Sequence, residues 1–297
     1  MVNELNNSQD ISNITNKFVD ALIKRDLLGI ENSVEEAIKN GFSAHDIYIN
    51  VFGSSQAKIG EMWHEGLITS AMEHFATEST LAQMIKVSQS FSTSKRNGFK
   101  VIVACVEGNL HSFGARIVAD FLRLDGWEVE FLGADTASGD LIEFAQSGQA
   151  DLIALAVSLD EQIDVVEDII HQLNDTYQKY KAPSILLGGV APSLNKFESY
   201  DNCSVVYTST HNALIEARRL VGLTYSGTVL SHYLVILGKK VHELRKAKNW
   251  SQSDLASKCG LDRTYISAVE HGKQNLTIGA AVKLSDSFGI HLTDLLS

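Results

Sequence analysis

Hydrophobic and polar positions divide the chain into three regions. From residue 9 to about residue 89, apolar side chains recur at helical spacing, beginning with Ile11 and Ile14. In residues 99–222, short apolar runs of β-strand type alternate with amphipathic helical segments. From residue 230 onward the pattern returns to short helices. The chain is therefore predicted to contain a helical bundle, then an α/β domain, then an all-α domain.

Start and stop signals delimit the helices of the first region. Gly41 is expected to close a second helix that runs from about Leu27. Ser43 is placed to cap a third helix, and Ser70 and Glu73 have the spacing of a capping box that opens a fourth. Four helices with short connections favour an antiparallel four-helix bundle.

The second region is predicted to be a doubly wound parallel sheet of flavodoxin-like type, because strands and helices alternate along it. The expected strands are residues 101–106, 128–132, 152–157, 184–187 and 204–206. Gly188 and Gly189 follow the fourth strand. They would let a large planar ligand approach a bare backbone, although a tight turn that needs glycine is the more common explanation of such a pair taken alone.

The third region is predicted to hold about five short helices. Ser251 and Asp254 form a capping signal, Gly260 lies at a turn, and Gly272 ends a helix that spans about residues 262–270. The predicted domains are residues 1–96, a bundle; 97–224, an α/β domain; and 230–297, a helical domain. Residues 223–229 are expected to form the joint.

Charge is distributed unevenly along the chain. The net charge is −11, yet residues 230–297 carry nine Lys and Arg against six Asp and Glu. A basic segment joined to an acidic remainder suggests a nucleic-acid-binding part. Three widely spaced cysteines indicate no disulfide framework and fit a reducing cytoplasm. No signal peptide and no membrane span are expected, because the first residues are polar and no apolar run is long enough.

One loop carries candidate ligand chemistry. The run Val101 to Val106 leads into a polar loop with Asn109, His111 and Gly114. Such a loop lies at the carboxyl edge of a parallel sheet, where ligands of these folds bind. The His111 imidazole could coordinate a metal, with Asn109 orienting the ring, although a lone loop histidine is more often a surface residue.

A second candidate group lies at one end of the bundle. Trp63 and His64 end the third helix, and Glu73 and His74 begin the fourth. Two plainer interpretations stay open for this group. Glu73 would simply complete the capping box with Ser70, and Trp63 would belong to the bundle core.

The loop motif Asn109-x-His111-x-x-Gly114, followed by Gly188-Gly189, is similar to the signatures of cobalamin-binding domains. The resemblance implies that His111 is the lower axial ligand of cobalt. It also implies that the dimethylbenzimidazole base enters a slot beside the sheet. The serine of the family's middle-strand motif falls at Ala156, with Ser158 close by, and its acidic residue is Asn109 here.

Trp63-His64 with Glu73-His74 looks like the signature of cobalamin-dependent photoreceptor regulators, the CarH/LitR family. That resemblance implies adenosylcobalamin as cofactor, with the bundle over the upper face of the corrin. Trp63 would pack over the adenosyl group with Glu73 and His74 beside it. His64 would match the residue that ligates cobalt after light expels that group.

Residues 236–297 resemble the Xre/Cro helix-turn-helix family, carried by residues 238–256 and 265–272. The resemblance implies a recognition helix in the DNA major groove and an ion pair between Arg245 and Glu270. The residues expected to contact DNA are Gln252, Arg263, Thr264, Tyr265 and Ser267, with Lys273 supplying positive charge toward the DNA backbone. A helical interaction domain that has lost DNA binding is the alternative, which the positive charge of this region disfavours.

Together these features predict a non-enzymatic transcription regulator. It would bind adenosylcobalamin and a double-stranded DNA operator, form a homo-oligomer, and change assembly and DNA binding when light cleaves the cobalt–carbon bond. A sensor of cobalamin or another tetrapyrrole without photochemistry is one alternative. A corrinoid methyl-carrier protein is another, against which the DNA-binding region argues.

Overall fold

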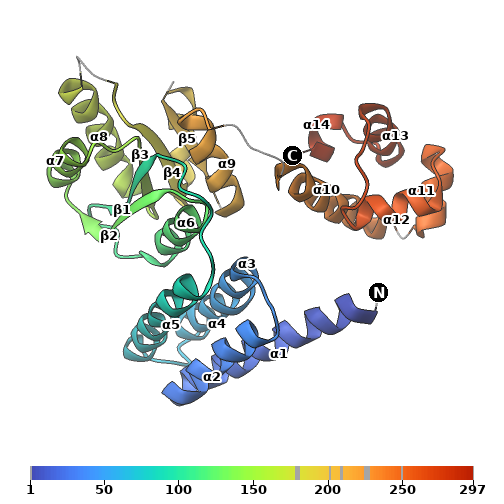
Figure 1. Ribbon diagram of the computed structural model, residues 1–297, viewed down its shortest axis with the longest axis horizontal. Coiled ribbons are helices and arrows are strands. Elements are labelled where there is room, and N and C mark those ends of the chain that lie inside the picture. Colours follow the sequence, from blue (N-terminus) through green and yellow to red (C-terminus); the bar gives the residue numbers. More distant parts are fainter. Residues whose placement is uncertain are drawn as a thin grey trace. The chain divides into compact units, whose positions relative to one another are not determined.

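The computed structural model describes residues 2–177, 181–200, 202–207, 210–223, 228–248 and 250–296. They form two compact units, Met1–Leu223 and Thr224–Ser297 (Figure 1). Within the joint predicted at 223–229, residues 224–227 lie outside the described residues. No helix in the described part of the chain is both long and apolar enough to span a membrane.

The first region is helical, as predicted. Its elements are α1 (Val2–Lys24), α2 (Leu27–Lys39), α3 (Ala44–Asp46), the π-helix η1 (Ile47–Gly53), α4 (Ser54–His64) and α5 (Ser70–Ser90). Because α3, η1 and α4 follow without a break, the predicted third helix is one run with a π-helical middle. The π-helical segment was not predicted, and such segments are frequent at functional sites.

Two predicted helix caps in the bundle have different outcomes. The Ser43 side chain accepts a hydrogen bond from Asp46 N, and the Asp46 carboxylate accepts one from Ser43 N, which confirms the predicted cap. The capping box predicted for Ser70 and Glu73 is wrong. Thr69 caps α5 instead, since its hydroxyl accepts a hydrogen bond from Met72 N.

The second region is a five-stranded parallel sheet in the order β2-β1-β3-β4-β5, which confirms the predicted flavodoxin-like fold. The strands are β1 (Lys100–Val106), β2 (Glu128–Thr136), β3 (Leu152–Val157), β4 (Ser184–Gly189) and β5 (Cys203–Val206). The connecting elements are α6 (Phe113–Leu124), α7 (Ser138–Gly148), η2 (Asp160–Gln162), α8 (Ile163–Thr176), η3 (Pro192–Ser199) and α9 (Thr210–Leu220). Gly188 and Gly189 are the last residues of β4 and not a turn after it.

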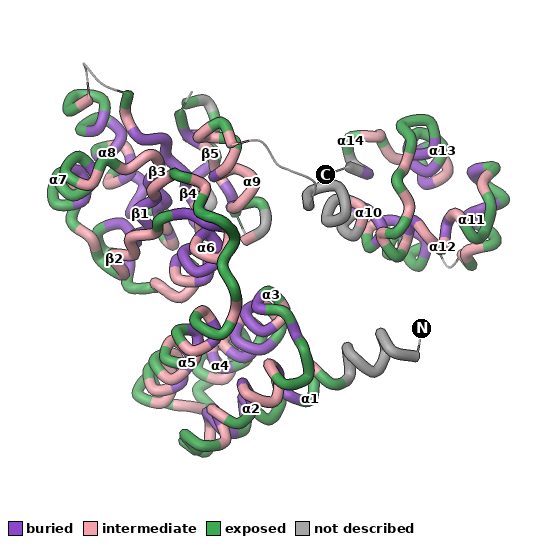
Figure 2. The backbone as a smooth tube through the Cα atoms, in the orientation of Figure 1, coloured by how far each residue is buried: buried purple, intermediate pink, exposed green. Residues whose placement is uncertain are grey.

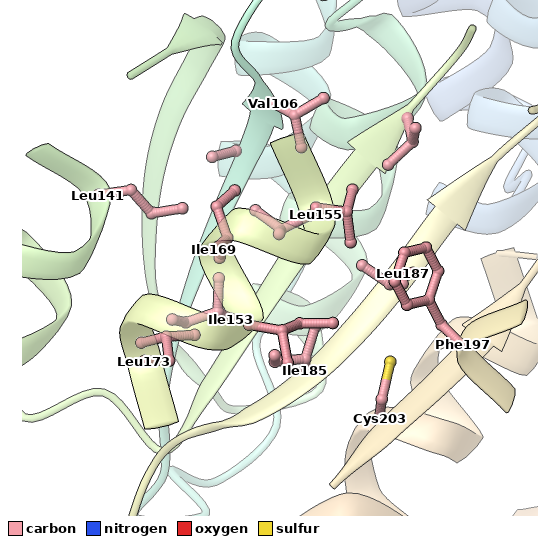
Figure 3. Packing of buried hydrophobic residues seen from close by; sticks show 14 of the residues in the cluster. Val106, Leu141, Ile153, Leu155, Ile169, Leu173, Ile185, Leu187, Phe197 and Cys203 are labelled. Carbon is pink, nitrogen blue, oxygen red and sulfur yellow. The ribbon is translucent and has the colours of Figure 1, made fainter. Parts of the chain in front are cut away.

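Both faces of the sheet are covered by helices. One apolar cluster packs α7 and α8 against residues such as Ile153 and Ile185 (Figure 3). The other joins α6 and α9 to the opposite face. The central strands β1 and β3 are therefore buried along most of their length (Figure 2). This burial explains their continuous apolar sequences.

The bundle core continues onto the α/β domain. Its buried cluster contains Phe18, Tyr48 and Phe52 from the bundle, and also Ile117 and Phe121 from α6. The α6 helix thus has one face on the sheet and one on the bundle. Since α6 begins directly after the His111 loop, that loop lies close to the seam between the two folds.

Within residues 228–248 and 250–296 the second unit has five helices, in agreement with the prediction. They are α10 (Thr228–Ala247), α11 (Gln252–Cys259), α12 (Arg263–Glu270), α13 (Ile278–Phe288) and α14 (Leu292–Leu296). Ser251 and Asp254 form the predicted capping box, and Gly260 ends α11 with a left-handed backbone. A small apolar core, which includes Val241, Leu255 and Ile266, holds the helices together.

Candidate functional site

A cavity of about 370 Å³ opens at the carboxyl edge of the sheet, beside α6 and α9. It brings together five predicted site residues: His111, Gly114, Ser158, Gly188 and Gly189. Much of the remaining wall is apolar, with Val103, Ala154 and Leu186 among the side chains. An apolar slot with a few polar groups is the usual form of a small-molecule site.

Large apolar side chains at this edge of the sheet are not buried, and two of them, Val190 and Tyr207, line the cavity. Leu110, Leu159, Val190 and Tyr207 are 72%, 51%, 68% and 43% exposed. They follow β1, β3, β4 and β5, so each lies at the same edge of the sheet. A cluster of exposed apolar groups marks a binding surface. The sequence contained the signal, a large apolar residue in the loop after four of the five strands, but our sequence analysis did not use it.

Asn109 does not orient the His111 ring as predicted. Its side chain is buried, and its Nδ2 donates a hydrogen bond to Ala156 O at 2.8 Å. Its Oδ1 accepts one from the backbone N–H of His111 at 3.0 Å. Both ends of the amide are therefore used to hold the loop backbone.

The two glycines at the end of β4 have different structural roles. Gly189 has a φ of +141°, and a Cβ there would overlap the carbonyl oxygen of Val157 on the neighbouring strand. A Cβ on Gly188 would lie 3.5 Å from Val206 O, an ordinary contact. The fold itself requires glycine at position 189, whereas position 188 has room beside the cavity.

Gly189→Ala is expected to destabilise the protein by at least about 1–3 kcal/mol, the usual cost of a disfavoured backbone conformation, with the overlap in addition. Gly188→Ala should leave the free energy of unfolding within about 1 kcal/mol, since its backbone has no positive φ. Urea unfolding of both variants measures the difference. Equal stability of the two would contradict this account.

The four predicted bundle residues lie where α4 ends and α5 begins. Trp63 and His64 are the last residues of α4, and Glu73 and His74 are near the start of α5. The Trp63 indole is 48% exposed, and its Nε1 donates to Ser70 Oγ at 3.1 Å. His74 Nδ1 lies 2.7 Å from Glu73 Oε2, and the Thr77 hydroxyl donates to Glu73 Oε1. His64 is exposed. Neither plainer interpretation holds, because Trp63 is outside the core and Glu73 caps no helix.

These four residues are not among those that line the sheet-edge cavity. The structure thus has two separate candidate groups. Both belong to the Met1–Leu223 unit.

A buried polar contact, which sequence analysis missed, links the bundle to α6. The Tyr48 hydroxyl lies 2.8 Å from Asp120 Oδ2 and 3.0 Å from Met84 O. Arg116 and Arg123 pair with the same carboxylate, which has no exposed surface. Burial, with Asp120 adding to it, raises the pKa of Tyr48, so the phenol remains a donor. No local pattern identifies this contact, because its partners are 72 positions apart.

In the second unit, Arg263 and Thr264 are exposed at the start of α12, and Tyr265 and Ser267 are half-buried on it. Lys273 is exposed just beyond this helix. The predicted ion pair is present: Arg245 Nε lies 2.6 Å from Glu270 Oε1. Gln252 Nε2 donates to the other carboxylate oxygen of Glu270 at 3.0 Å.

Comparison with known proteins identifies three family matches. Residues 99–218 and residues 14–85 each match a B12 binding domain, and residues 241–295 match a helix-turn-helix domain. The chain is 21% identical over 214 residues to Dimethylamine corrinoid protein 3 of Methanosarcina acetivorans, covering 71% of this chain and 99% of that protein. The structure of Methanosarcina barkeri monomethylamine corrinoid protein has a similar fold, with a TM-score of 0.56 and 18% identity. The match covers 71% of this chain and 99% of the monomethylamine corrinoid protein chain.

The third region has more similar relatives. Control protein C.BamHI of Bacillus amyloliquefaciens is 41% identical over 63 residues, which are 21% of this chain and 78% of that protein. The chain also spans 58% of the length of a Neisseria hypothetical transcription factor from Neisseria meningitidis, at 39% identity over 61 residues or 20% of this chain.

Fold and matches together define a B12-binding module, built from a helical region and a parallel α/β domain, fused to a DNA-binding type of domain. The carboxyl-terminal domain belongs to the helix-turn-helix family. This domain content fits a cobalamin-sensing transcription regulator better than an enzyme.

Proposed function

We propose that this protein is a light-responsive transcription regulator that binds adenosylcobalamin. In this proposal residues 1–96 cover the corrin, residues 97–224 hold it, and residues 230–297 bind the operator. The observation that carries the proposal is the cavity beside His111, combined with a helix-turn-helix domain on the same chain. When bound, adenosylcobalamin supplies a cobalt–carbon bond that visible light can break.

The residues at the sheet edge suit such a ligand. His111 presents an imidazole, a common metal ligand, at the wall of the cavity. A Cβ on Gly114 would meet nothing within 4 Å, so the helix start leaves open space where a large group can approach. The exposed side chains of Leu110 and Val190 offer apolar contact to the flat face of a macrocycle. Ser158 and Gly188 complete the wall.

The bundle residues would form the light-responsive side. The exposed Trp63 indole is assigned to cover the adenosyl group, with Glu73 and His74 beside it. His64 is assigned as the ligand available to cobalt once that group has left. Departure of a group against which the bundle packs would let the bundle move, and so change how DNA-binding domains are paired. Two helix-turn-helix domains bind an operator together only when the distance between them matches the spacing of the two DNA half-sites. A homo-oligomer is therefore part of the proposal.

The test is reconstitution of the full chain with adenosylcobalamin in darkness, followed by green light. The proposal expects a corrin absorption spectrum that changes on illumination, together with a change in operator binding and molecular mass. Hydroxocobalamin, which lacks the light-cleavable bond, is the control and should give no light response. A corrin spectrum without any light response would instead support a non-photochemical sensor.

The similarity to corrinoid proteins over 71% of the chain favours a methyl carrier as the second candidate. Methyl transfer from the bound corrinoid to a thiol or folate acceptor would support it. The helix-turn-helix domain has no role in such transfer, so operator binding by the same chain, once measured, would argue for the regulator.

Arg263→Ala is expected to weaken operator binding by about 1–3 kcal/mol and to relax specificity at one base pair, because an arginine at this position can contact guanine bidentately. Lys273→Ala should instead weaken binding to all sequences alike and reduce the salt dependence. Binding to the operator and to unrelated DNA across salt concentrations measures both. Identical effects of the two substitutions on both DNAs would contradict the assignment.

A further inference from the structure

Several backbone groups of the loop that leads into His111 have hydrogen-bond partners. Gly108 N donates to Asp135 Oδ1 at 2.7 Å, and Asn109 N donates to Val106 O at 3.0 Å. Asn109 O accepts from Asp135 N at 3.0 Å, and Asp135 has a left-handed backbone with a φ of +52°. The end of β2 therefore holds the loop after β1.

Two buried side-chain amides complete this arrangement from the β3 side. Asn109, which is 1% exposed, donates through Nδ2 to Ala156 O and accepts through Oδ1 from the His111 amide. Gln162, which is 5% exposed, donates through Nε2 to Gly108 O at 3.0 Å. We call these two amides the loop clamp.

Gln162 also fixes the loop that follows β3. Its Oε1 accepts hydrogen bonds from Ser158 N at 2.9 Å and from Leu159 N at 3.1 Å. The clamp thus joins the two loops on either side of the point where the strand order reverses, which is where ligands of such sheets bind. Ser158 and His111 on these loops both line the cavity.

Both clamp residues donate a hydrogen bond through the side-chain NH₂ group, which an amide has and a carboxylate lacks. A carboxylate at position 109 would set an oxygen acceptor against the carbonyl oxygen of Ala156. One at position 162 would do the same against Gly108 O. At this degree of burial, water has little access to compensate an unpaired or repelled oxygen.

We propose that Asn109 and Gln162 are positioning residues that pre-form the His111 loop through neutral amide donors, so that an acidic residue at position 109 cannot replace the asparagine. This inference rests on the proposed function for its consequence, namely that the clamp sets how well His111 reaches cobalt. It predicts that Asn109→Asp, which restores the acidic residue of the resembling family, weakens the site. A model in which residue 109 acts on the imidazole predicts the opposite.

The test uses Asn109→Asp and Gln162→Glu in the full chain, because each exchanges only an NH₂ group for an oxygen. Asn195→Asp, at an exposed position of the same domain, is the matched control. The first measurement is amide hydrogen exchange of residues 108–111 without cofactor. The second is the affinity for cobalamin and the fraction of bound cobalamin that shows a protein histidine ligand in its spectrum.

Both clamp variants should exchange these amides roughly ten- to a hundredfold faster than wild type, and their cobalamin affinity and histidine-ligated fraction should fall. The control should match wild type in both measurements. Unchanged exchange, or stronger histidine ligation in Asn109→Asp, would overturn the clamp. Failure of wild type to bind cobalamin would remove the proposed function. The exchange rates of residues 108–111 would still show whether Asn109 and Gln162 hold the loop in place.

Discussion

Arg245→Ala is expected to destabilise the Thr224–Ser297 unit by about 3–5 kcal/mol, enough to unfold a small domain. Arg245 is 4% exposed and donates to both oxygens of Glu270, at 2.6 and 2.9 Å, and to Trp250 O at 2.7 Å. Its removal leaves a carboxylate that is 2% exposed without its main counter-charge. Loss of helical signal and of operator binding on mild heating measures the effect.

Arg219→Ala is the matched control, because this arginine pairs with Glu216 while 58% exposed. Exposed pairs contribute about 0–1 kcal/mol, so little change is expected there. Comparable stability of the two variants would contradict the role given to Arg245.

The buried pair also sets a pH dependence. Burial raises the pKa of Glu270, but hydrogen bonds from Arg245, Gln252 and His242 outweigh it and lower the pKa below its ordinary value of 4.5. The pair therefore stabilises the folded unit above pH 4.5, and this contribution is lost as the pH falls through the lowered pKa. Acid unfolding of wild type, followed by helical signal, should show this loss.

His111→Ala is expected to lower the affinity for cobalamin by at least roughly a hundredfold, since loss even of a residue that supports a metal ligand costs ten- to a hundredfold. The backbone of position 111 is held by Asn109, so the loop should keep its course when the ring is removed. Equilibrium dialysis against cobalamin measures the affinity, and urea unfolding checks the fold.

His171→Ala on α8 is the control, because this histidine is exposed and does not line the cavity. It should bind cobalamin as wild type does. Equal uptake by His111→Ala and wild type, with unchanged spectra, would remove the role assigned to His111.

Local patterns in the sequence were sufficient for much of the fold. Buried parallel strands have continuous apolar runs, so the five strands were located, and the cap at Ser251 follows from side-chain geometry within four residues. The strand ends were less accurate. β2 continues to Thr136, and its register with β1 shifts twice between Phe131 and Thr136. At α5, Thr69 and Ser70 are both suitable caps, and the bond of Ser70 with the Trp63 indole is visible only in the structure.

The candidate site was predicted as a set of residues but not as a set of contacts. Five predicted residues line one cavity because the loops after β1 and β3, the start of α6 and the end of β4 meet at one edge of the sheet. The Asn109 side chain donates to Ala156 O on β3, which is 47 positions away in the sequence. The residues next to Asn109 in the sequence do not reveal this partner. Gln162 and the Tyr48–Asp120 contact were missed for the same reason, since each joins segments that are distant in sequence.

Electron paramagnetic resonance tests the central claim most directly. The full chain would be loaded with cobalamin, its cobalt reduced to the paramagnetic cobalt(II) form, and its histidines labelled with heavy nitrogen. Ligation by His111 predicts that the splitting from the axial nitrogen changes with the label and that the label has no effect in His111→Ala. A splitting that is the same in labelled and unlabelled wild type would mean that a nitrogen of cobalamin's own base binds the metal. That result would contradict the account.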